Sequence, residues 1–143
     1  MKIQQIATGG LIVRKDGKFL IVRRSLKDDF LPGYWELPGG GSDYGETPQQ
    51  ALQREIQEEC ALDITIRQPL TTCQYFMEET QRIEIIFFCT LNDEAQELQL
   101  SDEHDTSAWV STEELEKYKM DDFMAKVVQD AVGDLDYWSK KYL

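Results

Sequence analysis

Positive charge is scarce in this sequence. The 143 residues include 15 Lys and Arg against 27 Asp and Glu, so the formal net charge is −12 at pH 7. A chain with this charge repels the phosphate backbone of nucleic acids and the anionic surface of membranes. We therefore expect neither a nucleic-acid polymer nor a membrane as a partner. A small polyanionic substrate would need a metal ion between itself and the protein.

Cysteine is also sparse, and long apolar runs are missing. Cys60, Cys73 and Cys89 are odd in number and lack the spacing of metal ligands, which indicates small core residues in a reducing compartment. The N-terminus lacks the apolar core and cleavage site of a signal peptide, and no run approaches the length of a membrane span. These features predict a cytoplasmic protein. The length predicts one domain over residues 1–143.

A run of glycines at positions 39–41 leads into a predicted helix. Thr47 can cap this helix, and Pro48 suits its first turn because the amide that proline lacks would be unpaired there. Gln50 can reach back to the cap and complete a capping box. The helix is therefore expected to begin at Thr47.

Three carboxylates share one arc of the predicted helix. With Glu55 at zero, Glu58 lies at about 300° and Glu59 at about 40°. An apolar stripe beside this arc consists of Leu52, Ile56 and Cys60. Clustered like charges repel, so a positive group should offset them, and Mg²⁺ typically binds carboxylates, waters and phosphate oxygens. The arc predicts half of such a site, although an acidic helix face is more often a solvated surface.

The stretch 40–62 resembles the Nudix box. The matching pattern is Gly40, five residues, Glu46, seven residues, Arg54-Glu55-Ile56, one residue, Glu58-Glu59, one residue and Ala61-Leu62. Residues 31–41 are similar to the segment that precedes the box in this family. Ala61 departs from the pattern, since the family usually has glycine there, and a positive φ would cost alanine up to about 1 kcal/mol.

The resemblance implies a fold and an activity. The fold is an α/β/α sandwich in which a mixed β-sheet lies between the box helix and a C-terminal helix. The activity is Mg²⁺-dependent hydrolysis, with Mn²⁺ as an alternative, of a diphosphate linkage in a nucleoside diphosphate derivative. A MutT-like nucleoside triphosphate pyrophosphatase fits the compact chain best. The alternatives are an ADP-ribose or dinucleotide pyrophosphatase, a nucleotide-sensing domain without activity, and an acidic partner-binding helix.

The resemblance also implies roles for individual residues. The expected metal ligands and catalytic carboxylates are Glu55, Glu58, Glu59 and Glu103. Glu46 and Arg54 should pair and hold the helix to its loop. Glu103, with Asp105 as its substitute, is the preferred general base, in a segment that could also be a solvated acidic loop. His104 could act as an acid or base, but a lone surface histidine usually does neither.

Substrate contacts are expected from the segment that precedes the helix and from the glycines. Arg24 is the best candidate for a phosphate contact, and the alternative is that it only solubilises a hairpin end. Tyr34 could stack on a base or belong to the core. Gly39 and Gly40 complete the predicted binding residues.

The rest of the chain predicts strands and helices that suit the sandwich. Strands are expected at 3–13, 19–24, 35–37, 62–66, 70–76, 82–91 and just before Val110, with helices starting at Ser111 and spanning 121–138. Asp16-Gly17 predicts a hairpin turn. Tyr137, Trp138 and Tyr142 could pack into the monomer or form a homodimer contact.

Overall fold

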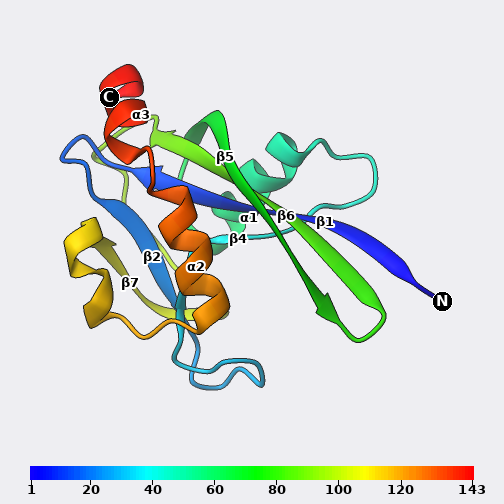
Figure 1. The fold of residues 1–143 in the computed structure, drawn as a ribbon. Coiled ribbons are helices and arrows are strands. Elements are labelled where there is room, and N and C mark those ends of the chain that lie inside the picture. The colour runs from blue at the N-terminus through cyan, green and yellow to red at the C-terminus, as the bar shows by residue number, and fades with distance from the viewer.

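A curved, mixed β-sheet with helices on both faces forms the fold in the computed structural model, which describes residues 1–143 (Figure 1). The elements are β1 (Ile3–Val13), β2 (Phe19–Arg24), β3 (Trp35–Glu36), β4 (Gly39–Gly41), α1 (Pro48–Cys60), β5 (Ile64–Met77), β6 (Thr80–Leu91), β7 (His104–Val110), the 3₁₀ helix η1 (Thr112–Lys117), α2 (Asp122–Ala131) and α3 (Leu135–Tyr142). None of the helices is long and apolar enough to cross a membrane.

The strands follow the order β3-β2-β1-β6-β5, with β4 added to β1 and β7 added to β2. β1 and β6 run parallel along the whole of β1, from Ile3 opposite Thr80 onwards. The predicted β1–β2 hairpin forms, but the two strands pair only where Val13 meets Phe19. Beyond that point β2 pairs with β7, while β4 takes the free edge of β1.

Two apolar cores lie on opposite faces of the sheet. Leu52, Ile56 and Cys60 of α1 pack on one face, and Val127, Val128 and Ala131 of α2 pack on the other. Successive strand residues alternate between the two faces, as the pleat requires. Leu11 and Phe88 belong to the α2 core, whereas Ile12 and Phe87 belong to the α1 core. The predicted α/β/α sandwich is therefore confirmed.

Helix α1 begins and ends as its sequence predicts. The Thr47 hydroxyl accepts from the amide of Gln50 at 3.1 Å, and the Gln50 side chain accepts from the amide of Thr47 at 3.0 Å. At the other end, Ala61 adopts the left-handed conformation with φ 55° and donates its amide to Gln57 O at 3.0 Å. This is the conformation that glycine adopts without strain.

Three predicted elements differ from the structure. β5 continues through Pro69, although its register shifts on both sides of this residue. Since β5 lies at the edge of the sheet, the missing N–H of proline need not break a ladder bond. The predicted helix over 121–138 is divided into α2 and α3 at residues 132–134, where Gly133 is a poor helix former. The helix expected after Ser111 is the short 3₁₀ helix η1.

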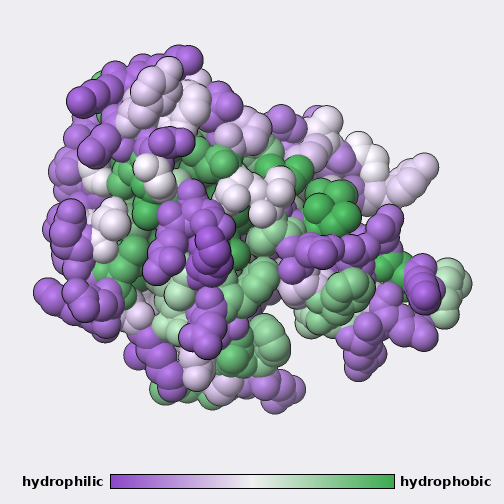
Figure 2. Space-filling view, viewed as in Figure 1, coloured by the Kyte–Doolittle hydropathy of each residue, from purple (hydrophilic) through white to green (hydrophobic).

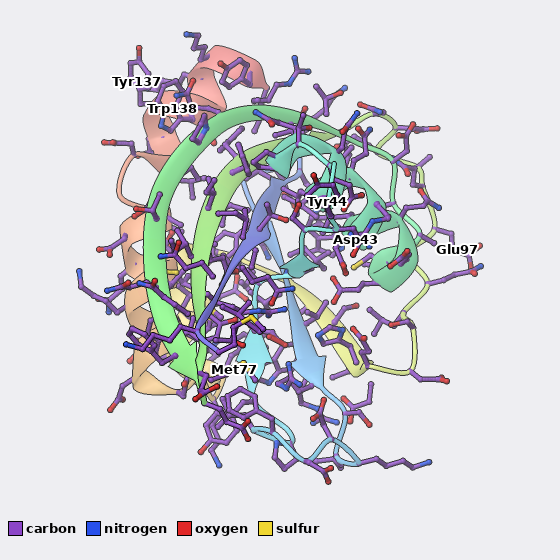
Figure 3. All side chains as sticks on the ribbon, turned by 90° about the vertical axis from the view of Figure 1, so that its right-hand side faces the viewer. Asp43, Tyr44, Met77, Glu97, Tyr137 and Trp138 are labelled. Carbon is purple, nitrogen blue, oxygen red and sulfur yellow. The ribbon has the colours of Figure 1, made fainter.

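The C-terminal aromatic residues have different environments. Trp138 and Tyr142 of α3 pack against the α2 core, as expected of a monomer. Tyr137 is 61% exposed and lies on α3 at the opposite end of the molecule from Met77 (Figure 3). A homodimer contact through these residues stays a prediction.

We predict that Ala61→Gly stabilises the protein. Glycine adopts a positive φ without steric cost, so the free energy of unfolding should rise by about 0.5–1 kcal/mol. Urea unfolding would show this as a higher midpoint with an unchanged slope. Ala125→Gly within α2 is the matched control and should lower the midpoint, because glycine costs about 1 kcal/mol inside a helix. A lower midpoint in both variants would contradict the prediction.

Candidate active site

Strand β4 approaches α1 closely because it consists of glycines. A Cβ atom on Gly39 would lie 2.0 Å from the carbonyl oxygen of Thr8, and one on Gly40 would lie 2.5 Å from Cδ of Glu55. A side chain on Gly39 would clash with the backbone of β1, and one on Gly40 would displace the carboxylate of Glu55. The amide of Gly39 donates to Oε2 of Glu59 at 2.9 Å. The glycine run therefore delivers a backbone donor to the acidic arc of α1.

Arg54 connects α1 to the loop before it and to β4. Its Nε and NH2 groups donate to the two carboxylate oxygens of Glu46 at 2.8 and 2.9 Å. The same guanidinium reaches Gly41 O at 3.1 Å and Glu55 Oε1 at 3.0 Å. Hydrogen bonds from Arg54 and from the amide of Asp43 lower the pKa of Glu46 to about 2. The predicted supporting pair is thus present as a bidentate ion pair.

The loop before β7 is anchored on the C-terminal end of α1. The amide of Gln99 donates to Cys60 O, and the amide of Ser101 donates to Glu59 O, both at 3.0 Å. Carbonyl groups at the end of a helix lack partners within the helix, so these bonds satisfy them. They also fix the start of β7 beside the Glu59 side chain.

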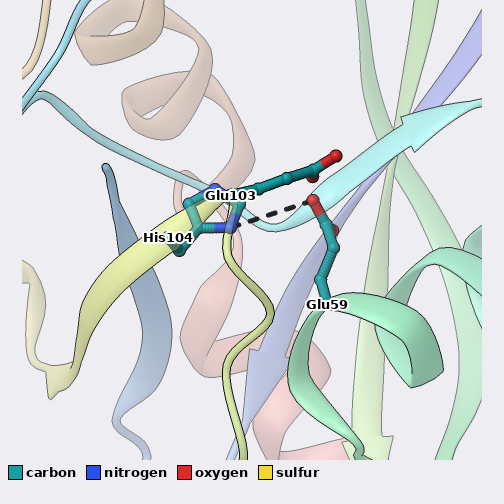
Figure 4. Close-up of side chains that lie close together, drawn as sticks. All are labelled: Glu59, Glu103 and His104. Carbon is teal, nitrogen blue, oxygen red and sulfur yellow. Dashed lines mark ion pairs between the residues drawn. The ribbon is translucent and has the colours of Figure 1, made fainter. Parts of the chain in front are cut away.

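Glu59, Glu103 and His104 converge at this point (Figure 4). One potential ligand atom from each lies within 4.8 Å of the others. Nε2 of His104 lies 3.2 Å from Glu36 Oε1, and its Nδ1 lies 4.0 Å from Glu59 Oε1. The His104 side chain is 3% exposed, so the expectation of a surface histidine was wrong. Its position at the start of β7, opposite Arg24 of β2, turns the ring inward.

Burial controls the protonation of the carboxylates on α1. Glu59 is 4% exposed, and burial, reinforced by the charges of Glu55 and Glu103, raises its pKa to about 9. The pKa of Glu55 is also raised, mainly by burial, although the bond from Arg54 opposes this shift. Without a cation, the arrangement therefore disfavours full ionisation of its own carboxylates.

Two predicted residues lie outside the cluster. The Glu58 side chain is 60% exposed, and its nearest cationic partner is Arg54 at 3.3 Å. Asp105, the substitute for Glu103, forms an ion pair with Arg23 at 2.7 Å. The structure thus brings together Glu55, Glu59 and Glu103, while a ligand role for Glu58 stays a prediction.

The predicted substrate contacts border one cavity of about 690 Å³, whose lining includes Arg24, Tyr34, Gly39 and Gly40. The guanidinium of Arg24 is already engaged, with bonds to Asp28 at 2.6 Å and to Glu36 at 2.9 Å. Phosphate would have to compete with these carboxylates. The contact of Arg24 with phosphate therefore stays a prediction.

The cavity extends beyond the carboxylates towards the β5–β6 hairpin and α2. This part is lined by Tyr75, Phe76, Met77, Phe123 and Met124. Figure 2 shows the corresponding hollow between α2 and the far end of the hairpin. Phe76 is 69% exposed although it borders a cavity, which is typical of a surface that binds a ligand. The carboxylates and the apolar lining thus share one space.

Sequence reasoning missed two acidic residues of this cavity. Glu36 accepts hydrogen bonds from Arg24, and His104 lies beside it. Glu84 of β6 also lines the cavity, and burial raises its pKa to about 7. The available signal for Glu84 was a lone carboxylate between Ile83 and Ile85 in an apolar strand. Glu36 had no comparable signal.

The cluster is suited to a divalent metal ion. Nδ1 of His104 is buried and has no hydrogen-bond partner, and the only basic side chain within 4.0 Å of the Glu59 carboxylate is His104 itself. A cation between them would satisfy the ring nitrogen and would neutralise the carboxylates of Glu59 and Glu103. Carboxylate oxygen and imidazole nitrogen are both common metal donors. The donor set therefore fits such an ion.

An acidic helix beside a cavity in an α/β/α sandwich defines a class of candidate metal-dependent hydrolases. Residues 3–131 match the NUDIX domain, and the chain belongs to this family. It is therefore a Nudix hydrolase, an enzyme that acts on phosphoric acid anhydrides.

The relatives agree with this assignment. Nucleoside triphosphatase NudI of Salmonella newport (strain SL254) is 31% identical over 120 residues, which cover 76% of this chain and 84% of the relative. The crystal structure of a MutT protein from Methanosarcina mazei Go1 has a TM-score of 0.77 and 26% identity, with 97% of each chain covered. An Ap4A hydrolase from C. elegans has a TM-score of 0.75 and 26% identity, covering 93% of this chain and 98% of its own.

We predict that Glu59→Gln stabilises the metal-free protein at alkaline pH. The pKa of Glu59 is about 9 when folded and near its ordinary value of 4.5 when unfolded. As the pH rises between these values, the unfolded chain loses its proton first, so the wild type loses stability. Glutamine removes this loss. At pH 8 in EDTA, we expect the melting temperature of Glu59→Gln to exceed that of the wild type by about 3 °C or more. Each kcal/mol in the free energy of unfolding is worth about 2–4 °C in melting temperature.

The control for this measurement is Glu97→Gln, because Glu97 is an exposed residue of the loop between β6 and β7 (Figure 3). It should melt like the wild type at every pH. The difference in melting temperature between Glu59→Gln and the wild type should become smaller as the pH is lowered towards 5. A difference that does not depend on pH would show that titration of Glu59 is not its cause.

Proposed function

We propose that this enzyme is a Mg²⁺-dependent pyrophosphatase of nucleoside triphosphates. The observation that carries this proposal is the single cavity that joins the carboxylates of α1 to an apolar lining from β5 and α2. A nucleoside triphosphate has a matching division between an anionic chain and a flat, largely apolar base. The relative named as a nucleoside triphosphatase and the similar MutT structure support this substrate class.

Glu55, Glu59 and Glu103 would hold the metal at the phosphate end of the cavity, with Glu58 as a further predicted ligand. Bound Mg²⁺ would neutralise charge on the phosphates and make a bound water more acidic. Arg54 and Glu46 hold α1 against its loop, so the carboxylates keep their positions without the substrate. Gly39 fixes one oxygen of Glu59 through its amide.

Glu103 is the proposed general base. Its side chain is exposed at the rim of the cluster, whereas Glu59 is buried and bonded to Gly39. A base must be able to reach a water molecule that lies in line with the leaving oxygen. Glu103 would take the proton of this water with the carboxylate oxygen that does not bind the metal. The products would be a nucleoside monophosphate and pyrophosphate.

The apolar part of the cavity would bind the nucleobase of the substrate. Tyr34 and Phe76 both line the cavity, one from the loop after β2 and the other from the end of β5. Tyr75 and Phe123 meet edge to face at 5.4 Å and form part of the same wall. Stacking between a base and an aromatic ring is worth about 1–3 kcal/mol and tolerates different bases.

A substrate panel with Mg²⁺ tests the proposed activity. The wild type should release pyrophosphate from nucleoside triphosphates faster than it cleaves ADP-ribose or a dinucleotide. Glu59→Gln should lower kcat by about 10²–10³-fold, which is the usual effect of losing a group that stabilises transition-state charge. Circular dichroism should show an unchanged fold. Glu97→Gln should retain wild-type turnover.

Other outcomes of the panel would replace this proposal. Faster cleavage of ADP-ribose or a dinucleotide, with two monophosphate-bearing products, would assign the runner-up activity. Nucleotide binding without turnover at millimolar Mg²⁺ would indicate a sensor. Wild-type activity in Glu59→Gln would remove the proposed metal assignment.

We predict that Phe76→Ala weakens nucleotide binding and leaves the chemical step largely intact. Because Phe76 is remote in sequence from the carboxylates and lines the apolar part, KM for a nucleoside triphosphate should rise by about tenfold with little change in kcat. Tyr137→Ala is the matched control, since Tyr137 is an exposed aromatic residue on α3. Steady-state kinetics would decide. An equal change in both variants would argue against a base site at Phe76.

A further inference from the structure

We propose that His104 binds the catalytic metal ion directly through Nδ1, together with Glu59 and Glu103. This inference rests on the proposed metal-dependent function and adds a nitrogen ligand to a site otherwise built from oxygen. A mixed donor set favours a first-row transition ion such as Mn²⁺ over Mg²⁺, because imidazole suits transition ions whereas Mg²⁺ takes oxygen ligands.

The hydrogen bond on the other side of the ring fixes the tautomer. The carboxylate of Glu36 accepts from the guanidinium of Arg24 at 2.9 Å, so it acts as an acceptor at this position. Nε2 of His104, at 3.2 Å from the same carboxylate, is placed to donate to it. In the neutral ring with its proton on Nε2, Nδ1 has the lone pair that a metal ion needs. A carboxylate bound to the far nitrogen is the usual support of a metal-binding histidine.

Nδ1 has no partner within the protein. The side chain is 3% exposed and Nδ1 is buried without a hydrogen bond, so solvent does not readily replace the missing contact. The ring nitrogen is directed towards Oε1 of Glu59, as Figure 4 shows. This buried acceptor is independent of the acidic cluster. It indicates that a cation belongs between the two side chains.

The distance between these atoms suits ligands of one ion. Metal–nitrogen and metal–oxygen bonds of about 2.0–2.2 Å place two ligand atoms about 2.9 Å apart at a right angle and about 4.2 Å apart on opposite sides. The observed separation of Nδ1 from Glu59 Oε1 is 4.0 Å, inside this range. It is too long for a hydrogen bond. The carboxylate oxygen of Glu103 lies within 4.8 Å of the other two ligand atoms, and its exposed side chain can move the short remaining distance when an ion binds.

Pulsed electron paramagnetic resonance of bound Mn²⁺ tests the proposal without any measurement of activity. His104 is the only histidine in the chain, so in protein free of a histidine tag any imidazole nitrogen coupled to Mn²⁺ must belong to it. With one equivalent of Mn²⁺ on the full chain, we expect electron spin echo modulation from a directly bound imidazole ¹⁴N. The signal should be lost in His104→Gln.

Metal affinity provides a second readout. The Kd for Mn²⁺ should rise by about tenfold or more in His104→Gln, with a smaller rise for Mg²⁺. Glu36→Gln is the matched control for a positioning role, because it keeps the imidazole ring and changes the carboxylate that supports it, a carboxylate that also pairs with Arg24. This variant should retain the nitrogen signal while binding Mn²⁺ more weakly. Melting curves would establish that each variant is folded.

The outcomes separate this inference from the proposed function. Mn²⁺ that binds the wild type without imidazole coupling would overturn the role of His104 and leave the carboxylate site intact. No Mn²⁺ binding at millimolar concentration would overturn both the ligand and the metal-dependent activity. Because the wild-type spectrum alone decides the first question, the test does not depend on the folding of a variant.

Discussion

A buried carboxyl group without a positive partner is the constraint on which the rest of this structure depends. Glu59 lies at the end of α1, accepts one hydrogen bond from Gly39, and faces Glu55 and Glu103. Removing a carboxylate from water costs several kcal/mol unless other groups stabilise it. The fold must therefore hold this side chain in place at the expense of stability. A divalent cation would offset that cost. The burial of Glu59 is therefore unfavourable in the metal-free protein and would favour the binding of a cation.

The elements around Glu59 act together to keep it there. The apolar stripe of α1 is fixed in its core, which turns the acidic arc towards the cavity. Arg54 joins the helix to Glu46 and to Gly41, and the amide of Ser101 binds the carbonyl of Glu59 itself. None of these contacts belongs to the metal-binding set. They allow a charged cluster to remain ordered before a ligand neutralises it.

The sequence predicted the parts of the site that depend on local structure. The cap at Thr47 and the orientation of Glu55 and Glu59 follow from helical geometry over a few residues, and the turn at Ala61 was expected from the resemblance to the family. The α/β/α sandwich was predicted from the resemblance of residues 40–62 to the Nudix box. The burial of His104 was not predictable in this way, because it depends on the pairing of β7 with β2. Glu84 likewise enters the cavity through the register of β6 against β1 and β5, which no local pattern specifies.

The residues proposed for chemistry and those proposed for substrate specificity are therefore positioned from opposite faces of the sheet. The carboxylates of α1 are positioned from one face of the sheet, where the helix is tied to its own loop and to β4. The apolar lining comes from the end of the β5–β6 hairpin and from α2, which packs on the opposite face. Phe76 and Phe123 are exposed and belong to neither core, so substitutions at these positions can reshape the cavity lining without moving Glu59. Proteins that share this acidic helix can in this way differ in the surface that they present to a substrate.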